Sequence, residues 1–343
     1  MFNSLPLAIG VFVVATALIG VFGSRLTRVT DRLADATGLG EAFFGAVFLG
    51  GATSLPGIIT SVTTAYQGYG QMAISNAIGG IAAQTSFLAI ADITYRKANL
   101  EHAAASQSNL INGTLLATLL AMPVLAIAGP EFSVFGIHPI TFAIPIVYYF
   151  GIRMVTKAKA SPMWHPEQTA ETKEDEPDEE NLDIKTRFLW IKFAGFALIT
   201  AGSGYMVARS GIFIADQTAL SETLVGGLFT AVATSLPELV TTVAAVRQGA
   251  LTLAVAVIIG GNCFDVLFVP FSDMAYRQGS IYHNIGEQEL FIFALSILMT
   301  GTLILGMLRR VKHGVGNIGF ESVTVIALYL GGFLIIAFGF GGS

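Results

Sequence analysis

The sequence has little charge for its length. Charged residues make up 12% of its 343 residues, 53% are hydrophobic, and the mean hydropathy is +0.69. Water-soluble domains carry roughly 25% charged residues, which they need to cover their surface. The scarcity excludes a chain folded wholly in water and predicts that lipid surrounds most of it.

Cysteine and histidine are scarce as well. The single cysteine, Cys263, excludes an internal disulfide. The five histidines lie outside the apolar runs or at their ends, which argues against a histidine proton relay within the membrane. The runs also lack G-x-G-D, H-E-x-x-H and Ser/Lys arrangements, so an intramembrane enzyme is the least favoured class. We expect that the protein is not an enzyme and that it has no resident cofactor and no nucleic-acid partner. The oligomeric state is open.

Long apolar runs recur along the chain. A helix needs about 20 residues to cross the roughly 30 Å of hydrocarbon in a bilayer. The sequence predicts an all-α membrane protein with ten transmembrane helices, near residues 5–24, 40–66, 71–95, 108–129, 137–155, 187–208, 222–246, 250–275, 288–308 and 318–340. One long polar segment, 156–186, is acidic and reads as a solvated linker between two halves, 1–155 and 187–343.

Basic residues are distributed unevenly between the loops. With ten spans, the odd-numbered loops hold sixteen of the 18 Lys and Arg residues, and the other side holds only Arg209 and Arg277. Because Lys and Arg concentrate in cytoplasmic loops, this bias places the 156–186 loop in the cytoplasm and both termini outside. We expect an integral protein of a bacterial inner membrane.

An internal repeat is the most informative feature. Shifting the sequence by about 181 residues aligns 35–96 with 216–277 without a gap. Matched segments include A-T-S-L-P at 52–56 and 233–237, I-G-G at 78–80 and 259–261, and a D-x-x-Y-R ending at 92–96 and 273–277. Equivalent spans, such as the second and the seventh, lie five spans apart in the chain. Because five is an odd number, the equivalent helices must run in opposite directions across the membrane. Inverted repeats are typical of secondary transporters, which bind substrate near the midplane. A duplicated scaffold without transport is the alternative.

The A-T-S-L-P-E segment at 233–238 combines a helix break with oxygen ligands. Pro237 has no N–H, so the carbonyl of residue 233 loses its helical partner. Thr234 and Ser235 supply hydroxyls at the same level, and Glu238 adds a carboxylate at a depth where ionisable groups are usually functional. Oxygen ligands of this kind suit hard cations such as Na⁺ or Ca²⁺.

The next span carries G-G-N-C-F-D at 260–265. Asn262 and Asp265 are three residues apart and share one helical face. With Glu238, Asp265 forms a pair of carboxylates on adjacent helices. Buried acids this close exchange protons in coupled steps, so proton-linked transport is also available. The alternative for Asn262 and Asp265 is a hydrogen-bonding role between helices.

These two motifs resemble the α-repeat of the sodium/calcium exchanger superfamily of cation antiporters. That family has a T-S-x-P-E segment followed by G-S-N-x-x-(N/D), in two inverted five-helix halves. The resemblance covers nearly the whole chain outside the acidic loop. It implies four central oxygen-rich sites that exchange Na⁺ for Ca²⁺. The matching motif positions are Glu238, Asp265, Asn262, Thr234, Ser235, Thr53 and Ser54, with helix breaks at Pro56 and Pro237.

The first copy departs from the family pattern. Gly57 stands where the family has a glutamate, Ile81 stands at the Asn262 position, and Gln84 stands at the Asp265 position. Gln84 still offers an amide oxygen, so we expect it to join the cation site. Two carboxylates remain, Glu238 and Asp265, and both come from one half.

The sequence therefore predicts a cation antiporter that exchanges Na⁺ or H⁺ against Ca²⁺ or another cation. A monovalent cation/proton exchanger that does not carry Ca²⁺ fits two acids as well. A non-exchanging cation sensor or leak channel is the remaining alternative. The stoichiometry and the direction of transport stay open.

Overall fold

The computed structural model describes residues 2–37, 43–94, 105–164, 186–249, 251–309 and 319–340. The first half contains α1 (Leu5–Leu18), the π-helical turn η1 (Ile19–Gly23), α2 (Ser24–Thr37), α3 (Phe43–Thr53), α4 (Leu55–Tyr66), α5 (Gly70–Thr94), α7 (Gln107–Ala128) and α8 (Ile140–Ala160). The second half contains α9 (Thr186–Gln217), α10 (Glu222–Leu224), the π-helical segment η3 (Val225–Thr230), α11 (Ala231–Thr234), α12 (Leu236–Gln248), α13 (Leu251–Asp265), α14 (Phe268–Ala275), the 3-10 turn η4 (Ile281–His283), α15 (Glu287–Arg309) and α16 (Phe320–Phe338).

The described chain is nearly all helical, as the sequence predicts. Seven of its helices are long and apolar enough to cross a membrane, and the number rises to nine if each of two bent helix pairs counts as one span. Helix α8 occupies the fifth predicted span, but it is not among these candidates. The transmembrane all-α class is therefore confirmed, and the count of ten spans in two inverted halves stays a prediction. The acidic residues 165–185 lie outside the described part.

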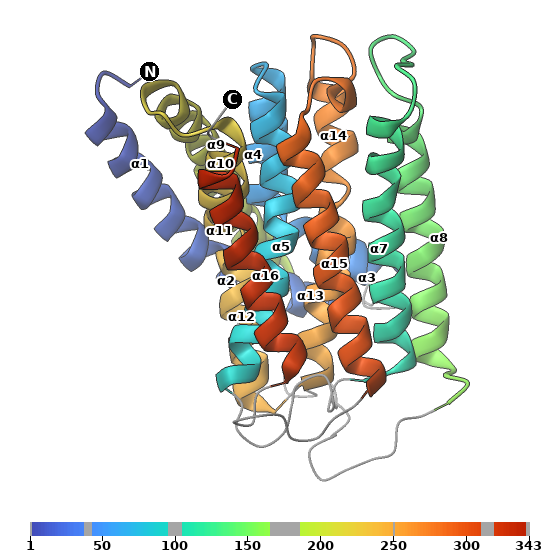
Figure 1. Cartoon of the computed structure of the whole chain (residues 1–343). Helices are drawn as coiled ribbons and strands as arrows, with labels where there is room; N and C mark the ends of the chain where they lie inside the picture. The colour runs from blue at the N-terminus through green and yellow to red at the C-terminus, as the bar shows by residue number, and fades with distance from the viewer. Residues whose placement is uncertain are drawn as a thin grey trace.

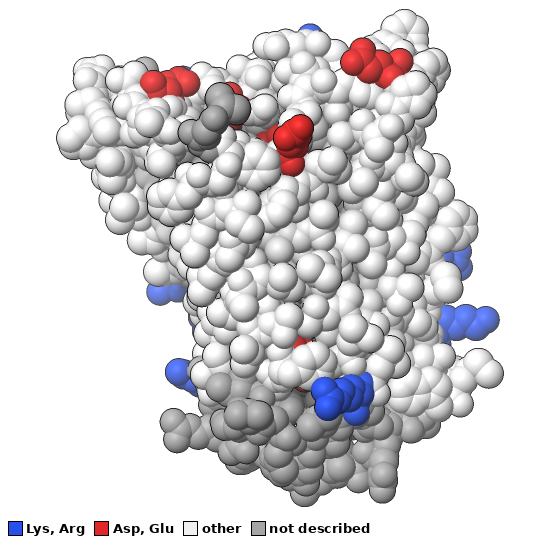
Figure 2. All heavy atoms as spheres, in the orientation of Figure 1, with Lys and Arg blue, Asp and Glu red and all other residues white. Residues whose placement is uncertain are grey.

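The helices form one upright bundle with its chain ends together. Helix α1 begins and α16 ends at the same end, which we call the terminal side (Figure 1). The opposite end, where α8 and α15 finish with Lys157, Lys159 and Arg309, is called the basic side. On the face shown in Figure 2, Asp and Glu gather mainly near the terminal side, and Lys and Arg gather toward the basic side.

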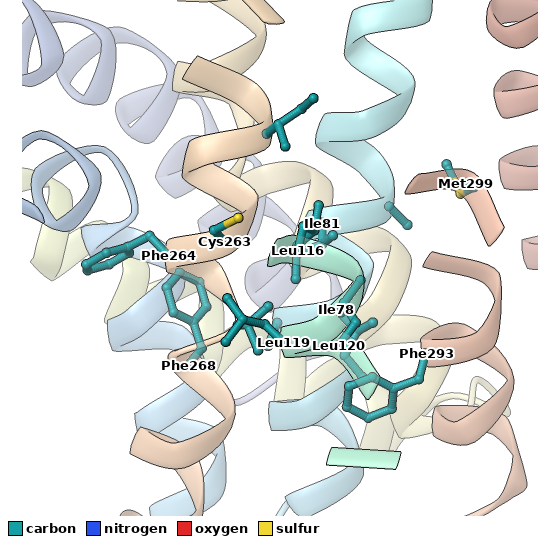
Figure 3. Close-up of a cluster of buried hydrophobic side chains, with 14 of the residues drawn as sticks. Ile78, Ile81, Leu116, Leu119, Leu120, Cys263, Phe264, Phe268, Phe293 and Met299 are labelled. Atoms are coloured by element: carbon teal, nitrogen blue, oxygen red, sulfur yellow. The ribbon is translucent and has the colours of Figure 1, made fainter. Parts of the chain in front are cut away.

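The centre of the bundle is filled by α5, which runs between helices of both halves. Helix α5 lies beside α4, η3, α13 and α15, and 94% of its most apolar 18-residue stretch is buried. Apolar side chains from α5 and α7 form one cluster with those of α13 and α15, as Figure 3 shows for Ile78, Ile81, Leu116, Leu119, Leu120, Cys263, Phe264, Phe293 and Met299. Burial of this cluster holds α5 and α13 in fixed positions beside the two bent pairs.

Candidate functional site

Two helices break at equivalent places in the repeat. Helices α3 and α4 meet at Ser54 with a bend of 65°, and the α10–α11 segment meets α12 at Ser235 with a bend of 48°. In each case a proline, Pro56 or Pro237, is the second residue after the break. Both bends lie at the breaks that the sequence predicts. Their cause is the proline, which removes one helical hydrogen bond and pushes the preceding turn aside.

Asp265 joins the two repeats at these breaks. It ends α13 and is 2% exposed. The hydroxyl of Ser54 donates to Asp265 Oδ1, and Gln84 Nε2 donates to Asp265 Oδ2 at 2.6 Å. The same Gln84 nitrogen lies 3.3 Å from Ser235 Oγ. Four residues that the sequence singles out therefore meet in one buried hydrogen-bonded group.

The contacts follow the symmetry of the repeat. Gln84 and Asp265 are 181 residues apart and occupy equivalent positions, yet they touch each other. Asn262 likewise lies against the carbonyl of its equivalent, Ile81, at 3.5 Å, and it donates to Thr85 Oγ1 at 3.0 Å. The site accordingly lies where α5 and α13 cross.

Several buried oxygens at this crossing have no hydrogen-bond partner in the described part of the chain. They are Glu238 Oε2, Gln84 Oε1 and Asn262 Oδ1. Glu238 is 5% exposed and close enough to Asp265 for the two carboxylates to interact electrostatically. An unpartnered buried polar atom costs about 1–3 kcal/mol, and more for a charged one. These buried, unpartnered oxygens come from carboxylate and amide groups. Together they form a set of ligand atoms suited to a hard cation.

Two predicted ligands are engaged differently. Thr53 Oγ1 donates to the carbonyl of Gly50 at 3.0 Å, and Thr234 Oγ1 donates to the carbonyl of Thr230 at 2.9 Å. Their protons are held by their own helices, so only the oxygen lone pairs can serve a ligand. Among the described residues, no group of three or more His, Cys, Asp or Glu could hold a metal ion.

The first-copy position of the missing acid is occupied by an aromatic ring. A Cβ added to Gly57 would lie 2.6 Å from Cε2 of Phe268 and 3.2 Å from its Cζ. Phe268 begins α14, directly after the acidic motif of the second copy. Gly57 is therefore more than a lost ligand, because its lack of a side chain lets Phe268 pack against α4.

The sequence reasoning missed Thr85, which receives the Asn262 amide, because Thr85 lies outside the matched motifs. It also missed the cap of α10. Ser221 accepts from Leu224 N at 3.1 Å and caps that helix, whereas Glu222 Oε2 lies 3.4 Å from Met72 N at the start of α5. A serine next to a glutamate is the signal that could have identified the cap.

The chain was compared with protein families and known proteins. The model of the family "Sodium/calcium exchanger protein" matches residues 7–152 and 188–339. Sodium/calcium exchanger MaX1 of Methanosarcina acetivorans is 34% identical over 143 residues, which cover 41% of this chain and 38% of that protein. The putative antiporter CaxA of Alkalimonas amylolytica is 26% identical, with 86% of this chain and 89% of that protein covered.

Two solved structures share the fold at low sequence identity. The H⁺/Ca²⁺ exchanger CAX superposes with a TM-score of 0.71 at 13% identity, covering 96% of this chain and 81% of that chain. The sodium-calcium exchanger NCX_Mj gives 0.61 at 20% identity, covering 95% and 98%. The family match spans nearly all of both halves, and like the sequence resemblance it leaves out the acidic segment 156–186. The chain is an integral membrane protein of the sodium/calcium exchanger family.

Proposed function

We propose that the protein is a secondary active cation antiporter that works by alternating access at the crossing of α5 and α13. It exchanges Na⁺ or H⁺ against Ca²⁺ or another cation, which are cargo rather than cofactors. One observation carries the proposal. Asp265 is bound by Ser54 and Gln84 of the other repeat, while Glu238 Oε2 beside it is buried without a partner. Charged groups inside a membrane are costly, and such pairs mark ion pathways.

The choice of cargo follows from the charges and the donor atoms. Two carboxylates balance one divalent cation, two monovalent cations, or protons that bind in place of a metal. The names of the relatives include Na⁺/Ca²⁺ and H⁺/Ca²⁺ exchangers, which supports both pairings. Ca²⁺ takes 6–8 oxygen ligands. Ser54, Ser235 and the carbonyl oxygens at the two breaks would complete that number around Glu238 and Asp265.

The proposal includes an orientation. The basic side lies in the cytoplasm, together with the 156–186 loop, and both termini lie outside. A relative from Escherichia coli is named an inner membrane protein, and it is 26% identical over 77% of this chain. We infer that a bacterial inner membrane is the location of the protein.

The function is tested in proteoliposomes. Purified protein is reconstituted, and uptake of ²²Na⁺ and ⁴⁵Ca²⁺ is measured under imposed Na⁺, K⁺ or pH gradients. The wild type is expected to take up one labelled cation only when a counter-ion is present on the other side. Glu238→Gln keeps the size of the side chain and removes its charge, so uptake should be abolished. Glu131→Gln, which changes an exposed carboxylate, is the control and should leave uptake unchanged. Normal exchange by correctly folded E238Q protein would refute the proposal.

A second candidate function is supported by the filled position at Gly57. Because Phe268 occupies the place of the third carboxylate, the chain could bind a cation without exchanging it, as a sensor or leak channel. The same vesicles distinguish this alternative. Cation flux that continues with no exchangeable ion on the other side would favour the leak channel, whereas a strict counter-ion requirement would exclude it.

A further inference from the structure

A second buried polar group lies between the site and the terminal side. Asn76 stands in α5 eight residues before Gln84, which places it about 12 Å nearer the terminal end. It is 1% exposed, and no sequence motif includes it. An asparagine this deep requires partners for both ends of its amide.

Asn76 has partners on two helical segments, α4 and η3. Its Nδ2 donates to Ser61 Oγ at 2.9 Å and lies 3.3 Å from the carbonyl of Gly57, both on α4. Its Oδ1 accepts from Thr230 Oγ1 of η3 at 2.7 Å. Ser61 in turn donates to the carbonyl of Ala73 on α5 at 3.1 Å. We call Ser61, Asn76, Thr230 and the Gly57 carbonyl the terminal seal.

The seal ties α5 to broken helices of both repeats. Segment α4 belongs to the first repeat and η3 to the second, and all three side chains of the seal are fully buried. Close backbone packing reinforces it. A Cβ added to Gly79 of α5 would lie 2.2 Å from the carbonyl oxygen of Gly227 in η3. On this side of the site, the helices are in contact without space for a cation to pass between α5 and η3.

The equivalent positions on the basic side are different. A shift of 181 residues converts Asn76 into Val257, Ser61 into Thr242 and Gly57 into Glu238. Valine makes no side-chain hydrogen bond, and Thr242 Oγ1 and Glu238 Oε2 are buried without a partner in the described chain.

The packing differs in the same direction. Gly260, the equivalent of Gly79, would place a Cβ 4.0 Å from Asn112 Nδ2, the nearest atom outside its own helix in the described part of the chain. Among the described residues, the polar contacts and the close packing of the terminal seal have no counterpart at these equivalent positions.

We propose that the terminal seal closes the path from the terminal side to the cation site, and that Asn76 is the positioning residue that biases the transporter toward the state open to the basic side. The inference rests on the proposed function, because a seal has meaning only if the site exchanges ions with both sides. Opening the terminal side requires α5 to part from α4 and η3, which breaks the Asn76 hydrogen bonds. Loss of this network should shift the ratio of the two states roughly tenfold or more toward the terminal-open state.

The test measures from which side the site can be reached. Cys263→Ala removes the native thiol, and Gly261→Cys introduces a reporter thiol. In the described part of the chain, the new Cβ meets Gln84 Oε1 at 3.7 Å outside its own helix, an ordinary contact that leaves room for the substitution. A membrane-impermeant, charged methanethiosulfonate is applied to each side of oriented vesicles. The reporter protein is expected to react mainly from the basic side.

Asn76→Val copies the residue of the second repeat and should raise the rate of labelling from the terminal side at least tenfold. Thr230→Val removes one hydrogen bond of the seal and keeps the shape of the side chain, so it should produce a smaller rise. Thr200→Val is the matched control for Thr230→Val, because Thr200 is a buried threonine of α9 that donates to the carbonyl of Phe196 in its own helix and lies outside the seal. It should leave the sidedness unchanged.

Unchanged sidedness in both seal variants would overturn the inference, and if N76V does not fold, the result of T230V decides. Labelling needs no transport, so the two proposals fail separately. Normal exchange by E238Q would refute the proposed antiport at Glu238 and would leave the proposed terminal seal standing. Unaltered labelling of both seal variants, together with an inactive E238Q, would refute the seal alone.

Discussion

The glycine that replaces a carboxylate in the first repeat permits a quantitative test. From the sequence alone, Gly57→Glu should restore a ligand and strengthen Ca²⁺ transport. The structure changes this expectation, because Phe268 already lies against the glycine. We predict that Gly57→Glu by itself fails to restore the site, and that it gains Ca²⁺ binding only when Phe268→Ala makes room.

The magnitude follows from the packing. The added Cβ would lie 2.6 Å from Phe268 Cε2, whereas ordinary van der Waals contacts of this kind begin at 3.4 Å. Overpacking on this scale costs about 1–3 kcal/mol, so Gly57→Ala should be destabilised by that amount. Phe268→Ala should cost about 3–5 kcal/mol for the lost ring. Because the two positions are in contact, the double variant G57E/F268A should be more stable than the sum of the single changes implies.

Thermal unfolding in detergent, with and without Ca²⁺, provides the assay. A third carboxylate that reaches the site should raise Ca²⁺ affinity at least tenfold, or about 1.4 kcal/mol, and the melting temperature of the double variant should rise more with Ca²⁺ than that of the wild type. F268A alone is the control and should show no such gain. Full stability of G57A, or a Ca²⁺ gain in G57E alone, would refute the reasoning.

Two further predictions concern packing and pH. Gly79→Ala should destabilise the protein by several kcal/mol or prevent insertion, because the new methyl would meet the backbone of Gly227. Gly202→Ala should be tolerated, since no described atom outside its own helix lies within 4 Å of the added Cβ. Thermal unfolding of the two variants compares them. Burial, and then the neighbouring His283, lower the pKa of His138, whose neutral Nδ1 accepts from Ile140 N. As pH falls, the histidine of the unfolded chain therefore binds a proton before the folded one does, so stability should fall as pH drops below about 6.5. Melting curves at pH 8 and 5.5 should show a smaller loss of melting temperature in His138→Gln than in the wild type.

Much of the architecture could be predicted from the sequence because its determinants are local. A proline inside an apolar run removes a helical hydrogen bond, and the helices bend beside Pro56 and Pro237 at the predicted places. Pro123 and Pro145 lie within α7 and α8, which continue past them. Matching motifs 181 residues apart indicate equivalent helices, and the contact between Gln84 and Asp265 agrees with that relation. The buried position of Glu238 followed from its depth in the seventh span.

The remaining features depend on contacts between distant segments. Nothing in the first repeat indicates that the place of its lost glutamate is filled by Phe268, because the ring comes from a helix 211 residues further along the chain. Asn76 lies outside the matched motifs, and its partner Thr230 is reached only after η3 packs against α5. Their role comes from the packing of both repeats and not from either segment alone.

The central claim is that Glu238 and Asp265 hold the transported cation where the repeats cross. The most direct test is anomalous diffraction from two crystals, one grown with Sr²⁺ in place of Ca²⁺ and one with Tl⁺ in place of a monovalent cation. The account predicts an ion in at least one of them, bound by oxygens of both carboxylates, with Sr²⁺–oxygen distances slightly longer than the roughly 2.3–2.6 Å of Ca²⁺. Ion density elsewhere in the protein, with none between Glu238 and Asp265 in either crystal, would contradict it.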